Sequence, residues 1–159
     1  VSEFHLAKNV LISAIIQLND TAERHERNHK IIVCASVENG KNEIELAAVA
    51  TMLETNGYTA LNLGSGINAE EINQFVVRTK PFAVCMYTTF TANAEQLTLE
   101  LKIIAELSKS SGSHCIVGGE AFNNEIVMGM DDVTFCGSFA EIESMQFRNI
   151  KSLSINNKK

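Results

Sequence analysis

The chain has 159 residues, 45% of them hydrophobic, which is enough for one domain with a buried core and a short appendage. Its formal net charge of -6 at pH 7 argues against direct binding of nucleic acid through a basic face. No apolar run is long enough to cross a bilayer and no signal-peptide pattern is present, so we expect no membrane contact and a cytoplasmic location. The first residue is Val1 rather than a methionine, which is compatible with a preceding domain.

Residues 2–28 have the pattern of an amphipathic helix. Their apolar residues recur at intervals of three and four and are Leu6, Val10, Leu11, Ala14, Ile15 and Leu18. We expect this helix to pack on the domain or on a second copy of the chain, where it would make a homodimer. His25 and His29 stand four residues apart, but no carboxylate or cysteine at a suitable spacing completes a metal site, so we interpret them as part of a solvated helix end.

From Lys30 onward, strand patterns alternate with helix patterns. Five short apolar runs are predicted to be strands, at residues 31–36, 59–63, 82–87, 114–117 and 133–136. Helix patterns cover residues 42–56, 68–80, 92–110, 123–130 and the segment from 140. This alternation predicts an α/β fold, a doubly wound sheet of five parallel strands in the flavodoxin-like order 2-1-3-4-5. The chain would then divide into an N-terminal helix (1–29), the sheet domain (30–150) and a flexible tail (151–159).

Four cysteines each fall inside a predicted strand, and they are Cys34, Cys85, Cys115 and Cys136. None of them belongs to a CxxC pair. We therefore interpret them as small buried hydrophobic residues in a reducing compartment rather than as metal ligands or a redox couple.

In a doubly wound sheet, ligands usually bind in a crevice beside the carboxyl ends of the strands. The turns that leave the five predicted strands are rich in glycine, serine, threonine and asparagine, which allow close approach to the backbone and supply neutral hydrogen bonds. Each glycine, taken alone, is also explained by a tight turn. Few charged groups lie near this rim and none of them is a histidine, so we predict no catalytic residue and no enzyme activity.

Seven short motifs follow one another along residues 30–144, and each of them occurs once. They are the strand leading into Glu38-Asn39-Gly40, Asn56-Gly57-Tyr58, Leu61-Asn62-Leu63-Gly64, Asn68-Ala69-Glu70-Glu71-Ile72, the lysine–proline pair before the third strand, Val117-Gly118-Gly119 and Gly137-Ser138. In this order and spacing the sequence resembles the cobalamin-binding domain of methionine synthases, corrinoid methyltransferase carriers, mutases and light-sensing regulators. The resemblance implies a flavodoxin-like fold.

The metal-binding motif of that family, Asp-x-His-x-x-Gly, does not match. Counting back from Gly57, the histidine position falls on Asn42, the aspartate position on Gly40 and the glycine position on Glu45. The resemblance implies that the histidine coordinates cobalt, and an amide is a poor substitute for it. Tyr87 stands where the family has a serine, and its ring and Glu45 are both expected to crowd the channel for the nucleotide tail of the cofactor. We therefore predict that coordination by histidine is lost.

What the resemblance implies is a non-catalytic regulatory or sensor domain that binds a tetrapyrrole and signals to a regulatory protein partner. The tetrapyrrole would be cobalamin without histidine ligation, or haem, because the turn from Gly118 to Phe122 is similar to a regulator branch in which haem replaces cobalamin. The expected cofactor-binding residues are Asn39, Gly40, Asn42, Gly64, Tyr87, Thr89, Thr91, Gly118, Gly119, Glu120, Gly137 and Ser138, with no metal ligand among them. His29 and His114, the candidate axial ligands for haem, are expected at the opposite edge of the sheet.

Two alternatives stay open at this point. One is a protein-interaction domain that has lost the cofactor, binds none and pairs through its N-terminal helix. The other is a corrinoid carrier subunit of a methyltransferase, which would need a cobalt ligand that the sequence does not offer at Asn42.

Overall fold

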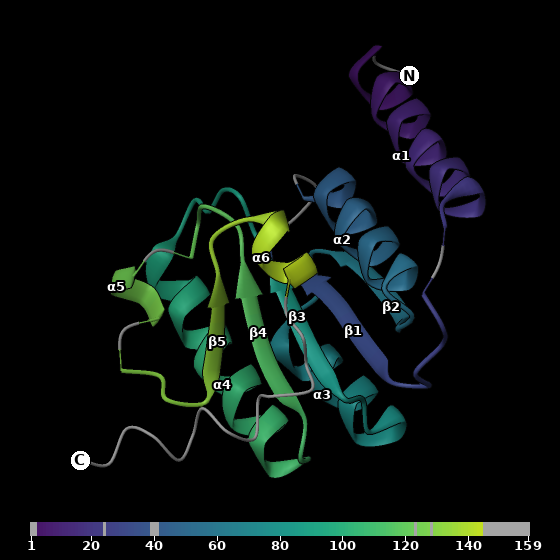
Figure 1. The fold of residues 1–159 in the computed structure, drawn as a ribbon. Helices are drawn as coiled ribbons and strands as arrows, with labels where there is room; N and C mark the ends of the chain where they lie inside the picture. Colours follow the sequence, from purple (N-terminus) through teal and green to yellow (C-terminus); the bar gives the residue numbers. More distant parts are fainter. Residues whose placement is uncertain (1–2, 24, 39–41, 123, 128, 145–159) are drawn as a thin grey trace.

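The chain folds around one parallel β-sheet. The computed structural model describes residues 3–23, 25–38, 42–122, 124–127 and 129–144. Within these residues the strands are β1 (Ile31–Ser36), β2 (Thr59–Ser65), β3 (Ala83–Tyr87), β4 (His114–Gly118) and β5 (Val133–Cys136). They lie side by side in the order β2-β1-β3-β4-β5, and all neighbouring pairs are parallel (Figure 1). The predicted fold class and strand order are confirmed, while the predicted tail (151–159) lies outside the described residues.

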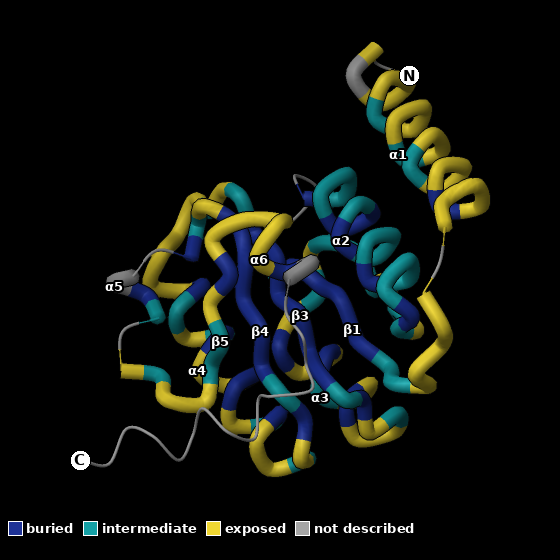
Figure 2. Tube along the Cα trace, viewed as in Figure 1, coloured by how far each residue is buried: buried dark blue, intermediate teal, exposed yellow. Residues whose placement is uncertain are grey.

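Helices cover both faces of the sheet. The helices of the described residues are α1 (Glu3–Thr21), which packs on α2, and α2 (Glu43–Thr55), α3 (Ala69–Thr79), α4 (Ala94–Ser110), α5 (Asn124–Val127) and α6 (Phe139–Ser144). Side chains of β3 alternate between the faces, so that Val84 and Met86 pack toward α3 and α4, whereas Cys85 and Tyr87 pack toward α2 and α6. The central strands are buried on both sides, as their continuous apolar sequence predicts (Figure 2). Among the described residues, no helix is both long enough and apolar enough to span a membrane.

The N-terminal helix is shorter than predicted, because α1 ends at Thr21 and the prediction continued to residue 28. The chain after it runs along the end of α2, where the backbone N–H of His25 donates to the carbonyl of Thr55 at 2.8 Å and that of Asn28 donates to the carbonyl of Gly57 at 3.0 Å. These hydrogen bonds take the place of those that the same backbone groups would have made in a longer α1. His25 and His29 are both exposed but do not share a helix face, so the interpretation as a helix end is wrong.

One face of α1 contacts the outer side of α2 (Figure 1). Lys8 forms an ion pair with Glu43 at the start of α2, and the side-chain amide of Asn19 donates to Glu54 near its end. The helix is therefore held at both ends of α2, while most of its surface lies away from the domain.

The four cysteines are buried and unbridged, each within a strand. Cys34 on β1 lies opposite Cys85 on β3, and their hydrogen bond together with burial raises the pKa of Cys85 well above its ordinary value. Burial raises the pKa of Cys115 and of Cys136 to about 12. Thiols that stay protonated at neutral pH are weak nucleophiles and weak metal ligands, which supports their interpretation as core residues.

Candidate functional site

The residues predicted to bind a cofactor gather at the carboxyl edge of the sheet, as its topology requires. Those that the structure describes are Asn42, Gly64, Tyr87, Thr89, Thr91, Gly118, Gly119, Glu120, Gly137 and Ser138. Each of them lies at the end of a strand or in the segment that follows one. Asn39 and Gly40 lie outside the described residues. We call this edge the crevice, and its geometry decides what it can hold.

Asn42, at the position of the family's histidine, is fully buried immediately before α2. Its Nδ2 donates to Oγ of Ser36 at 3.0 Å, and its Oδ1 accepts both from the backbone N–H and from the hydroxyl of Thr89, each at 2.9 Å. Oγ of Ser36 in turn lies 3.0 Å from Oγ1 of Thr88, which extends the network across β3. The acceptor Oδ1 of Asn42, the atom through which an amide would bind a metal, is thus filled from within the fold.

Ser36 and Thr88 belong to this network but were not among the predicted site residues. Each is a polar residue that directly follows apolar residues of a strand, and each has 0% exposure. This position in the sequence could have identified both residues as part of the site. A hydroxyl that is buried at the end of a strand needs a hydrogen-bond partner, and the loop that follows usually supplies it.

Tyr87 fills the space between the ends of the strands and α6. Its side chain is only 5% exposed, and its ring stacks on Phe139 with centroids 5.1 Å apart and an interplanar angle of 15°. A Cβ atom at Gly118 would lie 2.9 Å from Cδ2 of the same ring, so β4 approaches the tyrosine closely. The pKa of Tyr87 is raised above its ordinary value, first by burial and second by the negative charge of Glu45. The ring therefore fills this space in the structure, and the crowding of a channel for the nucleotide tail stays a prediction.

The Gly118-Gly119 pair has a structural explanation. Gly119 has a φ of 98°, and a Cβ atom there would lie 2.3 Å from the carbonyl oxygen of Thr88. The backbone N–H of Thr88 donates to the carbonyl of Gly118 at 2.9 Å, and that of Ala121 donates to the carbonyl of Thr88 at 3.1 Å. Only glycine allows the loops after β3 and β4 to meet in this way.

The hydroxyl of Thr91 donates to the carboxylate of Glu38, which joins the loops after β3 and β1. The carbonyl oxygen of Glu38 also accepts from the backbone N–H of Gly66 at 3.1 Å, so the turn after β2 is held at the same point. These bonds fix the loops to one another and use polar atoms that would otherwise face a ligand.

Gly137 and Ser138 immediately precede α6. The backbone N–H of Gly137 donates to Oε2 of Glu141 at 2.8 Å, and Oγ of Ser138 accepts from the backbone N–H of Glu141 at 3.3 Å. This reciprocal arrangement caps the helix. Gly64, by contrast, has open space where a Cβ atom would be, and Glu120 is exposed.

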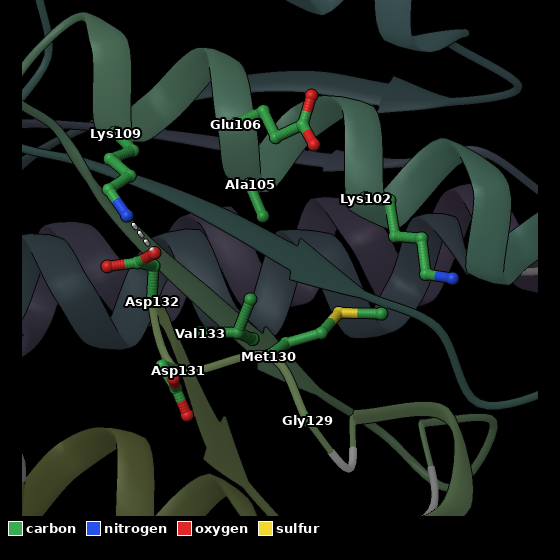
Figure 3. Close-up of a pocket in the computed structure, with 9 residues that line it drawn as sticks. All are labelled: Lys102, Ala105, Glu106, Lys109, Gly129, Met130, Asp131, Asp132 and Val133. Carbon is green, nitrogen blue, oxygen red and sulfur yellow. Dashed lines mark hydrogen bonds and ion pairs between the residues drawn. The ribbon is translucent and has the colours of Figure 1, made fainter.

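A hollow of about 380 Å³ lies between α4 and the segment that enters β5, away from the carboxyl edge (Figure 3). Ala105, Met130 and Val133 line it together with charged side chains, and Nζ of Lys109 is 2.6 Å from Oδ2 of Asp132 across its wall. None of the predicted site residues lines it.

In the described part of the chain, no group of three or more histidine, cysteine, aspartate or glutamate side chains is placed to hold a metal ion. His114 begins β4 and His29 precedes β1, so both lie at the amino edge of the sheet, as predicted.

No protein-family model and no curated protein sequence matches the chain. Solved structures do. A cobalamin-binding protein from Desulfitobacterium hafniense superposes with a TM-score of 0.58 at 22% identity, over 85% of this chain and 64% of that one. The chain has the fold of cobalamin-binding proteins. The predicted resemblance is confirmed at the level of the fold.

Two further structures with this cobalamin-binding fold come from Methanosarcina barkeri. The methanol:cobalamin methyltransferase complex MtaBC gives a TM-score of 0.62 at 19% identity, over 87% of this chain and 53% of that one. The monomethylamine corrinoid protein gives 0.61 at 17% identity, over 86% and 62%. The chain thus spans between about half and two thirds of the length of the structures that it matches.

The contacts around Asn42 and Tyr87 decide whether this edge can hold a cofactor in the manner of the family. Asn42 is enclosed by partners within the fold, and the ring of Tyr87 occupies the space below the carboxyl edge. The residues present therefore do not fit a cobalamin whose metal is held from position 42 and whose tail enters beside Tyr87.

Proposed function

We propose that this chain is a non-catalytic regulatory domain of the cobalamin-binding fold that acts by binding a protein partner, without a buried cofactor. The observation that carries the proposal is the closed network around Asn42, in which Ser36 and Thr89 take the hydrogen bonds that a ligand would need. A buried polar group leaves such partners only at a free-energy cost of about 1–3 kcal/mol. A ligand would have to offset that cost for each group.

The exposed face of α1 supports the use of a partner. Lys8, Ile12, Ile15 and Asn19 turn toward α2, while the opposite stripe of the helix is apolar and exposed (Figure 2). Its largest members are Leu6, Val10, Leu11 and Leu18, which are 63%, 60%, 51% and 64% exposed. Apolar side chains gathered on one stripe are typical of a contact surface. We assign this stripe to a second copy of the chain, because an apolar stripe is self-complementary and two-fold pairing is the commonest assembly.

A tetrapyrrole sensor is a second candidate, and the open backbone at Gly64 favours it. Cobalamin without histidine ligation, or haem, would then lie over the loops of the crevice rather than inside it. A corrinoid carrier is supported less, because it needs a cobalt ligand and the amide of Asn42 is engaged.

An absorption spectrum separates these proposals. The purified protein is mixed with hydroxocobalamin or with haem and passed through a gel-filtration column. An unchanged cofactor spectrum and no co-elution are expected if the domain acts without a cofactor. A red-shifted spectrum that co-elutes with the protein would contradict our first proposal and support the sensor.

A further inference from the structure

The helix α1 contacts α2 through one regularly spaced row of residues. Among the described residues of α1, those that are not exposed are Lys8, Ile12, Ile15 and Asn19. They follow one another at intervals of four, three and four residues, which is the spacing by which one helix packs along another in a coiled coil. The ion pair and the amide hydrogen bond to α2 lie at the two ends of this row. We call it the inner seam.

A second row with the same spacing lies beside the inner seam and is exposed. It consists of the residue that precedes each member of the inner seam, and its members are Ala7, Leu11, Ala14 and Leu18. Consecutive residues of a helix point about 100° apart, so this outer seam faces sideways from the contact with α2. The two leucines are 51% and 64% exposed.

The polarity of the two seams is the reverse of what a solvent-exposed helix needs. The inner seam, which is covered by α2, includes a lysine and an asparagine, whereas every member of the exposed outer seam is apolar. The exposed side of a helix in a globular domain is usually polar. The outer seam therefore has the composition of a surface that another helix covers.

A second copy of the chain can cover the outer seam in two ways. Two copies related by a two-fold axis present the same residues to each other, with their helices either parallel and in register or antiparallel. In the parallel pair, each layer of facing side chains holds two alanines or two leucines. The helix axes cannot be close at one layer and distant at the next, so the alanine layers would leave unfilled space, which is destabilising.

The antiparallel pair has no such mismatch. With the two-fold axis between residues 12 and 13, Ala7 faces Leu18 of the second copy, and Leu11 faces its Ala14. Every layer then holds one small and one large side chain, which is how facing helices interdigitate. No other antiparallel register with this spacing pairs all four residues of the outer seam with one another. The seam is thus complementary to itself in size, in one orientation and one register.

We propose that two copies of the chain pair through antiparallel α1 helices, outer seam against outer seam, with the two-fold axis between Ile12 and Ser13. This proposal rests on the proposed function and specifies its partner by orientation and register. Because α2 lies on the inner seam of each α1, the contact consists of four helices in the order α2-α1-α1-α2. It accounts for an apolar surface on a helix that contacts its own domain mainly through α2 (Figure 1).

Disulfide cross-linking of the whole chain tests the orientation. Ala7→Cys and Leu18→Cys are made as separate variants, mixed in equal amounts and oxidised with glutathione disulfide, and the covalent dimer is measured on a non-reducing gel. The mixture is expected to form the dimer and each variant alone is not, because two copies of either position lie about 16 Å apart along the antiparallel pair, beyond the reach of a disulfide. The four native cysteines are at most 2% exposed, so the wild type is expected to stay unlinked.

Asn9→Cys mixed with Ile16→Cys is the matched control. These exposed positions are related by the same two-fold axis, but they lie on the other side of the inner seam. Their mixture is expected to give at least tenfold less covalent dimer than the mixture of the outer-seam variants. Equal linking in the control would show random collision and would overturn the proposal. Linking of each outer-seam variant alone, with no gain in the mixture, would show a parallel pair and would also overturn it.

An exchange of side-chain size tests the register. Ala14→Leu places two leucines in each central layer and is expected to weaken dimerisation at least tenfold in sedimentation velocity, because a close-packed contact has no room for the larger side chain. Leu11→Ala combined with Ala14→Leu restores one small and one large residue to each layer. It is expected to return the dissociation constant to within threefold of the wild-type value. Alanine and leucine both favour helix, so α1 is retained in both variants. A double variant as weak as the single one would overturn the register.

Failure of the pairing and failure of the proposed function give different results. A wild-type chain that sediments as a monomer even at millimolar concentration would overturn the antiparallel pair and would leave a regulatory domain with another partner. Co-elution of hydroxocobalamin or haem with the protein would contradict the proposed function and would leave the antiparallel pair in place.

Discussion

Replacement of Asn42 by alanine tests whether the crevice is held shut by its own hydrogen bonds. The change removes one bond to Ser36 and two bonds to Thr89, all of them at a side chain with 0% exposure. At about 1 kcal/mol for each bond, the free energy of unfolding should fall by about 3 kcal/mol. For a chain of this size the melting temperature should fall by roughly 6–12 °C.

The unfolding of N42A is best followed in urea by far-ultraviolet circular dichroism, because the chain has no tryptophan. Asn62→Ala is the matched control, since Asn62 is exposed and its Oδ1 accepts one bond, from the backbone N–H of Gly64 at 2.9 Å. The control should lose less than about 1 kcal/mol, as surface substitutions usually do. If N42A lost no more than the control, the network would not hold the loops together and our account of the closed crevice would be refuted.

Substitutions at Gly119, Tyr87 and Val10 test three other features of the fold. Gly119→Ala should destabilise the domain by several kcal/mol in the same urea assay, because its φ is positive and the new Cβ would overlap a carbonyl oxygen, whereas Gly112→Ala, with a positive φ but open space, should lose about 1 kcal/mol. The pKa of Tyr87 is raised in the folded chain, so stability should fall as the pH rises above 10 through the ordinary tyrosine pKa toward the folded one. The phenylalanine variant of Tyr87 should lose this part of the alkaline fall in urea titrations, and an unchanged profile would argue against burial of the phenol. Val10→Glu on the exposed stripe of α1 should turn a dimer into a monomer in sedimentation velocity, while Asn9→Glu should not; a wild-type monomer would remove the homodimer.

The sheet was predictable because its signals are local. Each strand is a short apolar run that ends in a polar turn, and β5 (Val133–Cys136) was predicted with its observed bounds. The helix pattern predicted from residue 68 corresponds to α3, whose N-cap Asn68 accepts a hydrogen bond from the backbone N–H of Glu71. Such caps and turns depend on residues close in sequence, which is why the pattern of the chain reveals them.

The end of α1 could not be predicted in the same way. The polar segment after Thr21 has no helix breaker, and its path is decided by hydrogen bonds to Thr55 and Gly57, which are distant in sequence. A Cβ atom at Gly57 would lie 2.3 Å from the carbonyl oxygen of Glu26, so this glycine serves the close approach of the linker as well as the end of α2. Tertiary contacts of this kind override local helix propensity.

The sequence predicted where the site residues lie, but it did not predict which hydrogen bonds they make. Those of the expected residues that the structure describes lie at the carboxyl edge, and Asn42 and Tyr87 are buried there. What the sequence did not show is that Asn42 would be satisfied by Ser36 and Thr89, because the pairing depends on the register of β1 and β3. Whether any of these residues contacts a cofactor stays a prediction.

The loops at the carboxyl edge are organised by one another. Glu38 joins Thr91, Asn42 joins Thr89, and the backbone of Thr88 joins that of Gly118, so the loops after β1, β3 and β4 are linked in a continuous series. Ligand-binding loops usually have low local stability in the unbound protein, because their polar groups are hydrogen-bonded only when the ligand is present. Here the hydrogen bonds that join the described parts of these loops are made within the chain itself. Loops that are already joined to one another lose little conformational entropy when another protein binds, which supports the protein partner that we propose.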